Sequence, residues 1–219
     1  MVKYLRKIDW ATLIPALMLS GIGLLFIASA AENMGSPPPP FAERQILWLF
    51  VSILVYFTLL FLGLKRIKKM APFFFAAAFL LVALVLEIGT YYKGAKRWIT
   101  LGWFNLQPSE FAKFSYILFI PLLLIEGKAK KITYFAIFLG ITLLLILLIA
   151  AEPDLGTSLV FLPLGFIMAS AAGTKRLYLA SAFLILIIAT LCSLEHLRPY
   201  QKERILAFAN PEPVSYTHL

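Results

Sequence analysis

Charged residues are scarce in this sequence. They make up 14% of its 219 residues, whereas 61% of the residues are hydrophobic. Soluble domains contain about a quarter charged residues and about half apolar ones. The composition therefore excludes an ordinary soluble protein and indicates an integral membrane protein. The mean hydropathy of +0.88 points the same way.

Cysteine and histidine are almost absent, with one and two copies respectively. A lone Cys192 excludes an internal disulfide, and its apolar surroundings favour a small buried side chain over a reactive thiol. His196 and His218 are too isolated to form a metal site. The cofactor stays unknown at this point, and a divalent cation remains an option.

Seven apolar runs have the length of a membrane-spanning helix. The first is longer than the roughly 7–15 apolar residues of a signal peptide, so we expect it to be retained. Short loops separate the runs, so neighbouring helices should pack antiparallel. We therefore predict an all-α, polytopic membrane helical bundle. Its expected spans are roughly Ala11–Ala31, Ile46–Leu64, Ala71–Gly89, Ser109–Ile125, Ile132–Ala150, Thr157–Ala172 and Leu177–Leu194.

Basic residues are distributed unequally between the two sides of this bundle. The side that holds the N-terminus carries twelve of the twenty Lys and Arg residues, and the opposite side carries seven. Cytoplasmic loops are rich in Lys and Arg, so the N-terminus is predicted to be cytoplasmic. The basic residues of the outer side are then Arg44, Lys93, Lys96, Arg97, Arg198, Lys202 and Arg204.

The outer segment Tyr91–Phe114, YYKGAKRWITLGWFNLQPSEFAKF, gathers several of these charges. Anchoring at lipid headgroups is the simplest explanation, because Lys, Arg and Trp commonly lie at the membrane interface. Glu110 and Lys113 are three residues apart, so they share one face of a helix that Pro108 can begin. Such a pair should face the bundle interior or a water-filled cavity. It is either a functional site, which we favour, or a structural salt bridge.

The second outer motif is EPDLGT, Glu152–Thr157. Pro153 is expected to end one helix, and Asp154 is expected to cap the next by accepting backbone N–H bonds. Capping does not explain Glu152. The two carboxylates could also hold a cation or orient a basic residue. A third outer segment, Glu195–Pro213, is predicted to form an amphipathic helix that meets lipid headgroups or a phosphorylated lipid substrate.

Outer cations and carboxylates at a membrane suit a substrate with a polyprenyl tail and a phosphorylated sugar. Arg and Lys bind phosphate or pyrophosphate. In a glycosyl transfer, cations would stabilise the departing pyrophosphate and a carboxylate would deprotonate the attacking hydroxyl. A flippase or transporter of lipid-linked sugars, and a non-catalytic membrane scaffold, are the alternatives.

Three motifs, GAKRWITLGWFNLQPSEFAKF, EPDLGTSLVF and YQKERILAFANPE, resemble in order and spacing the signatures of the SEDS family (shape, elongation, division and sporulation). The resemblance runs from about Ile8 to Pro213, and the third motif is more similar to the RodA branch than to the FtsW branch of cell division. It implies a peptidoglycan glycosyltransferase that polymerises lipid II, an undecaprenyl-pyrophosphate-linked disaccharide-pentapeptide, during elongation and shape maintenance. The implied place is the outer face of the bacterial cytoplasmic membrane, and the implied partner is a class B penicillin-binding protein, with no nucleic acid.

The resemblance also implies which residues bind substrate or support the active site. By position these are Lys96, Arg97, Trp98, Glu110, Lys113 and Asp154. Family members have about ten spans, and their general-base Asp lies in a TDFIF-type motif that does not occur here, so no catalytic residue is assigned. Glu152 stands where the family usually has Gln. We expect residues 1–213 to be the N-terminal part of a SEDS domain, inactive alone, and the VSYTHL at 214–219 to be non-native.

Overall fold

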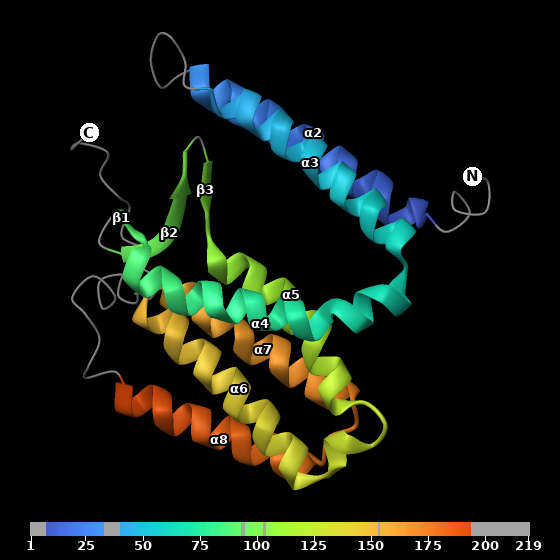
Figure 1. Ribbon diagram of the computed structural model, residues 1–219, viewed down its shortest axis with the longest axis vertical. Helices are drawn as coiled ribbons and strands as arrows, with labels where there is room; N and C mark the ends of the chain where they lie inside the picture. Colours follow the sequence, from blue (N-terminus) through green and yellow to red (C-terminus); the bar gives the residue numbers. More distant parts are fainter. Residues whose placement is uncertain (1–7, 33–39, 93–94, 103, 153, 194–219) are drawn as a thin grey trace. The chain divides into compact units, whose positions relative to one another are not determined.

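Apolar helices make up most of the structure, a computed structural model that describes residues 8–32, 40–92, 95–102, 104–152 and 154–193 (Figure 1). Each of the seven predicted spans corresponds to one α-helix, so the predicted fold class is confirmed. Within the described residues the helices are α2 (Trp10–Glu32), α3 (Phe41–Leu62), α4 (Leu64–Ile88), α5 (Pro108–Leu124), α6 (Ile132–Ala151), α7 (Leu155–Ala171) and α8 (Arg176–Ser193).

The basic segment Lys65–Lys69 is helical, although it was predicted to be a loop. It forms the start of α4, and only Gly63 separates α3 from α4. Gly63 has a φ of 75°, which glycine adopts without steric cost, and its N–H donates to the carbonyl of Leu59 at 3.1 Å. Lys and Arg are good helix formers, so nothing after Gly63 prevents the helix from starting at once.

The connection between α4 and α5 was predicted as a loop and instead forms a three-stranded antiparallel sheet. Its strands are β1 (Thr90–Tyr92), β2 (Ala95–Leu101) and β3 (Phe104–Leu106), in the order β1-β2-β3. A short 3-10 helix, η1 (Lys128–Lys130), follows α5. The aromatic and β-branched residues of β2 suit a strand, and Gly102, with a φ of 64°, lies between β2 and β3. The sheet matters because it carries part of the predicted site.

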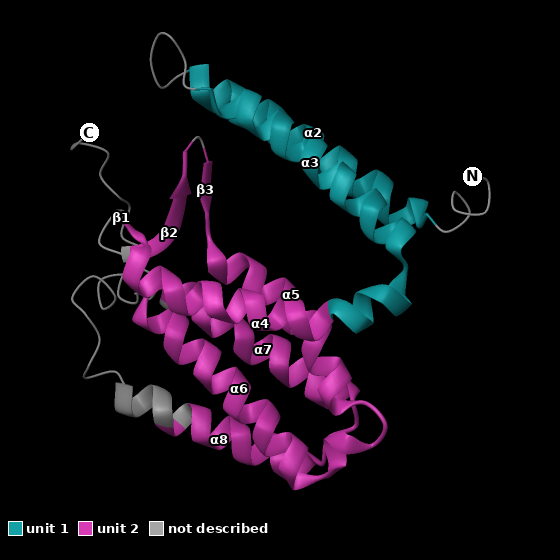
Figure 2. Ribbon diagram, viewed as in Figure 1, with its two compact units in different colours: residues 1–70 teal, residues 71–219 magenta. Residues whose placement is uncertain are grey.

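The chain divides into two compact units, Met1–Met70 and Ala71–Leu219 (Figure 2). In the first unit α2 packs against α3. Asp9 precedes α2 and accepts from the N–H of Ala11 at 3.1 Å and the hydroxyl of Thr12 at 2.6 Å. In the second unit α5, α6 and α7 pack together, with α8 against α6 and α7. Its fully buried side chains include Tyr116 and Phe161.

A buried hydroxyl pair ties α5 to α6 in the core of the second unit. The hydroxyls of Tyr116 and Thr142 lie 2.7 Å apart, and Thr142 donates to the carbonyl of Phe138 at 2.8 Å. Since that donation uses the Thr142 proton, Tyr116 is the donor in the pair. Gly165 of α7 leaves room for this arrangement, because a Cβ there would lie 2.6 Å from the Tyr116 hydroxyl. The packing of these three helices sets the positions of the ends that carry the polar residues.

Four of the described helices, α2, α3, α4 and α6, are long and apolar enough to cross a membrane. Large apolar side chains lie on the outside of the helices, among them Phe26 at 72% and Phe73 at 77% exposure. Surfaces of this kind are unusual in soluble monomers and are expected where lipid covers the protein. The chain is therefore a multi-pass membrane protein, while the cytoplasmic location of its N-terminus stays a prediction.

Candidate functional site

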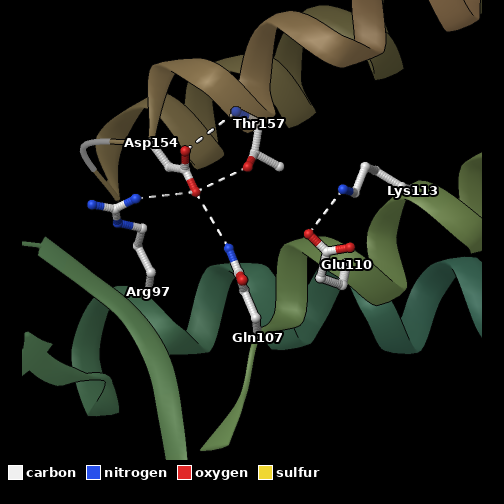
Figure 3. A network of polar contacts seen from close by, with 6 residues as sticks. All are labelled: Arg97, Gln107, Glu110, Lys113, Asp154 and Thr157. Atoms are coloured by element: carbon white, nitrogen blue, oxygen red, sulfur yellow. Dashed lines mark hydrogen bonds and ion pairs between the residues drawn. The ribbon is translucent and has the colours of Figure 1, made fainter. Parts of the chain in front are cut away.

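Asp154 is the centre of a polar cluster at the junction of α6 and α7 (Figure 3). Its Oδ1 accepts from the backbone N–H of Thr157 at 3.2 Å, and its Oδ2 accepts from the Thr157 hydroxyl at 3.0 Å. The predicted N-cap of α7 is thereby confirmed. Nη1 of Arg97 lies 3.6 Å from Oδ2, and Nε2 of Gln107 donates to the same oxygen at 3.3 Å. One buried carboxylate thus joins β2, the start of α5 and the start of α7.

Of the two additional roles considered for the outer carboxylates, holding a cation or orienting a basic residue, Asp154 has the second. Its partner Arg97 keeps 19% of its side chain exposed, against 8% for Asp154. A guanidinium and a carboxylate this close neutralise each other in a weakly polar setting. Within the described part of the chain, no three His, Cys, Asp or Glu residues lie together as metal ligands would.

Lys96 and Trp98 flank Arg97 in β2. The strand register shifts at this point, because Trp98 pairs with Thr90 and Lys96 with Tyr91, so the regular alternation of side chains between the two faces is interrupted. Nζ of Lys96 donates to the carbonyls of Leu86 and Glu87, at 3.3 and 3.4 Å, at the end of α4. A cation is favourable there, since the C-terminal end of a helix carries partial negative charge. Trp98 is half-buried, and its carbonyl accepts from a side-chain hydroxyl of β1 at 3.0 Å. The six predicted site residues therefore do not form one contact cluster.

Glu110 and Lys113 form the ion pair that their spacing predicts. Nζ of Lys113 lies 2.8 Å from Oε1 of Glu110, on the first two turns of α5 (Figure 3). The Lys113 side chain is 25% exposed and that of Glu110 is 46% exposed. Such a partly exposed pair contributes at most about 1 kcal/mol to stability. Its exposure leaves both groups accessible to a ligand.

Gln107 belongs to the cluster but was not among the predicted site residues. It occupies the N-cap position of α5 and makes no capping bond with its side chain. Pro108 follows at the first helical position, as predicted, and needs no N–H acceptor. The Gln107 amide is therefore free to reach Asp154. The sequence did contain a signal for a role of Gln107 in the site. Glutamine is a poor N-cap residue, so its presence before Pro108 had no local explanation.

Glu152 is completely buried, and neither of its carboxylate oxygens has a hydrogen-bond partner in the described residues. It lies directly after α6, outside the membrane-spanning segment. Burial raises the pKa of Glu152 from 4.5 to about 8; the negative charge of Asp154 adds to the rise, and Arg97 partly opposes it. The Glu152 side chain is therefore predominantly protonated at pH 7, although Asp154 and Arg97 lie close to it.

An apolar cleft of about 510 Å³ lies between α6, α7 and α8 in the second unit. Phenylalanine and leucine side chains line most of it, including Phe138, Leu162, Phe166 and Phe183. Its lining suits a hydrocarbon chain. The remaining predicted element, Glu195–Pro213, and the segment 214–219 lie outside the described residues.

The second unit carries a buried charge cluster at the starts of the apolar helices α5 and α7. Such an arrangement defines a polytopic membrane protein with a polar site near the membrane surface. The chain belongs to the FtsW/RodA/SpoVE family of cell cycle proteins, whose model matches residues 9–217. This match confirms the SEDS resemblance. The Asp154 cluster lies well inside the matched range.

Two curated relatives carry the names of the two branches of this family. The chain is 33% identical over 201 residues to the "Probable peptidoglycan glycosyltransferase FtsW" of Tolumonas auensis, covering 88% of this chain and 51% of the relative. It is 34% identical over 174 residues to the peptidoglycan glycosyltransferase RodA of Treponema pallidum, covering 78% and 40%. The chain therefore spans about half or less of these relatives.

Solved structures agree with the fold. RodA of Thermus thermophilus matches with a TM-score of 0.70 and 30% identity over 82% of this chain and 59% of that one. A chain from a structure titled "Structural coordination of polymerization and crosslinking by a peptidoglycan synthase complex" matches with a TM-score of 0.74 and 28% identity, over 93% and 59%.

Proposed function

We propose that this chain belongs to a peptidoglycan glycosyltransferase that polymerises lipid II at the outer face of the bacterial cytoplasmic membrane. The observation that carries the proposal is family membership over nearly the whole chain, with relatives of both branches named as glycosyltransferases. The Arg97–Asp154–Gln107 cluster and the Glu110–Lys113 pair supply charged groups where the pyrophosphate sugar would lie. The cleft between α6, α7 and α8 suits the polyprenyl tail.

The chemistry assigns different tasks to these groups. The bond from the anomeric carbon to pyrophosphate breaks while a sugar hydroxyl of a second substrate attacks, so negative charge grows on the leaving group and a proton must leave the nucleophile. Lys113 is the more exposed of the two cations, at 25% against 19% for Arg97, and is assigned to the pyrophosphate. Asp154 is fully engaged by its partners, so it positions Arg97 and the start of α7. The general-base Asp that the family resemblance implies as the proton acceptor lies in the TDFIF-type motif, which this sequence does not contain.

A cross-linking partner is part of the proposal, because one matched structure is a complex that joins polymerisation to cross-linking. We infer that this partner is a class B penicillin-binding protein. The third sequence motif supports the elongation branch. Rescue of cells depleted of RodA, with no rescue of cells depleted of FtsW, would test that assignment.

Substitution of the accessible ion pair tests the function. In the full-length product of this gene, Lys113→Met and Glu110→Gln are each expected to lower the rate of polymerisation of purified lipid II by about 100-fold. The melting temperature should change little, since a partly exposed pair adds at most about 1 kcal/mol. Gel analysis of the glycan product and thermal unfolding in detergent provide the two measurements.

The chain offers a matched control in Glu126 and Lys128, whose charged groups lie 4.0 Å apart after α5. Lys128→Met and Glu126→Gln should leave polymerisation unchanged. Full activity of Lys113→Met would show that the Glu110–Lys113 pair is only a structural salt bridge. Movement of lipid II across vesicles by the wild-type protein without polymer formation would favour the transporter alternative.

A further inference from the structure

Glu152 is a buried acidic residue that the proposed mechanism does not use. Four buried side-chain oxygens in the described residues have no hydrogen-bond partner: two belong to Glu152, and the others belong to Ser109 and Thr174. A hydroxyl without a partner loses one or two hydrogen bonds. A carboxylate in the same position would lose the whole solvation of its charge, which is far more costly. Burial and the missing partners therefore require Glu152 to hold a proton.

Among the described residues, two charged groups act on Glu152. Asp154, two residues further along the chain, repels a second negative charge, and Arg97 of β2 would attract one. Arg97 is already paired with Asp154 at 3.6 Å. Helices α6 and α7 contain no charged residue. The charged residues of α5 are Glu110 and Lys113, which pair with each other.

We propose that Glu152 is a proton-dependent positioning residue for the cluster formed by Arg97, Asp154 and Gln107. When Glu152 is neutral, the Arg97 guanidinium pairs with Asp154 alone. When Glu152 releases its proton to solvent, its carboxylate competes with Asp154 for Arg97 and also repels Asp154. The contacts that Arg97 of β2 and Gln107 of α5 make with the start of α7 are then weakened. The effect on the cluster is independent of the reaction, whereas the effect on activity rests on the proposed function.

Stability should therefore depend on pH in a defined direction. The pKa of Glu152 is about 8 in the folded protein and 4.5 as its ordinary value, so between these values the folded state binds more protons than the unfolded state. Stability then falls as the pH rises through this window and levels off above the folded pKa. In Glu152→Gln the side chain has nearly the same shape and never ionises, so this contribution should vanish.

The test compares the melting temperature of the wild-type full-length gene product and its Glu152→Gln variant in detergent, from about pH 6 to about pH 9.5. The wild type should lose stability relative to Glu152→Gln as the pH rises. Glu126→Gln, which changes an exposed glutamate, should follow the wild type. Infrared spectra should show a protonated carboxyl band at neutral pH that Glu152→Gln lacks. Parallel melting curves for the wild type and Glu152→Gln would overturn the proposal.

The pH profile of polymerisation separates positioning from simple stability. One pH unit above the pKa only about a tenth of Glu152 is neutral, so wild-type activity should fall about tenfold there relative to Glu152→Gln. Glu152→Gln should keep wild-type activity at neutral pH. Equal pH profiles for both proteins would overturn the positioning role. If no protein polymerises lipid II while the melting difference persists, the proton link stands and the proposed function fails.

Discussion

Asp154→Ala is expected to lower lipid II polymerisation by at least about 100-fold and to destabilise the full-length gene product by on the order of 3 kcal/mol. The substitution removes the N-cap of α7, which alone contributes about 1 kcal/mol. It also leaves the largely buried Arg97 without its counter-charge and leaves the amide of Gln107 without its acceptor. An unpaired buried charge accounts for most of the loss. Thermal unfolding and the polymerisation assay measure the two effects.

Asp154→Asn separates the capping role from the charge. Asparagine is as good an N-cap as aspartate, so the bond from the Thr157 N–H should survive. The charge that holds Arg97 is lost. We therefore expect Asp154→Asn to be more stable than Asp154→Ala and yet about as inactive. Wild-type activity in Asp154→Asn would contradict a role for the charge and reduce the cluster to a helix cap.

The helices could be predicted because apolar length alone determines them in a membrane. The ends of the helices were less predictable, because basic residues at a membrane surface are compatible with a helix as well as with a loop. For this reason the start of α4 at Leu64, directly after Gly63, was not predicted. The sheet was missed for a different reason. Its strands are three to seven residues long, and a segment as short as Phe104–Leu106 has too little alternation to be distinguished from a loop.

The local parts of the site were predictable, and the long-range parts were not. The Glu110–Lys113 pair and the Asp154 cap follow from spacings of three residues within one helix turn. The ion pair between Arg97 and Asp154 depends on how a strand packs against two helices, and no local sequence pattern indicates this packing. The burial of Glu152 depends on the same packing. Sequence could only show that capping did not explain this residue.

Gly165→Ala is expected to destabilise the helical core by about 1–3 kcal/mol. The added Cβ would lie 2.6 Å from the hydroxyl of Tyr116 and 3.2 Å from the ring of Phe138. Tyr116 is completely buried and donates to Thr142, so it cannot move aside without losing that bond. Gly140→Ala is the matched control, because a Cβ at Gly140 of α6 meets nothing within 4 Å. It should be neutral or slightly stabilising, since alanine favours helix over glycine.

A double substitution identifies the cause of this destabilisation. Tyr116→Phe removes the oxygen that the new methyl group would strike, and Thr142 keeps its bond to the carbonyl of Phe138. The cost of Gly165→Ala should therefore be smaller in the Tyr116→Phe background than in the wild type, which gives a favourable coupling between the two sites. Thermal unfolding of the four proteins measures it. Equal costs in both backgrounds, or equal melting temperatures for Gly165→Ala and Gly140→Ala, would show that the contact between α5 and α7 can relax around a methyl group.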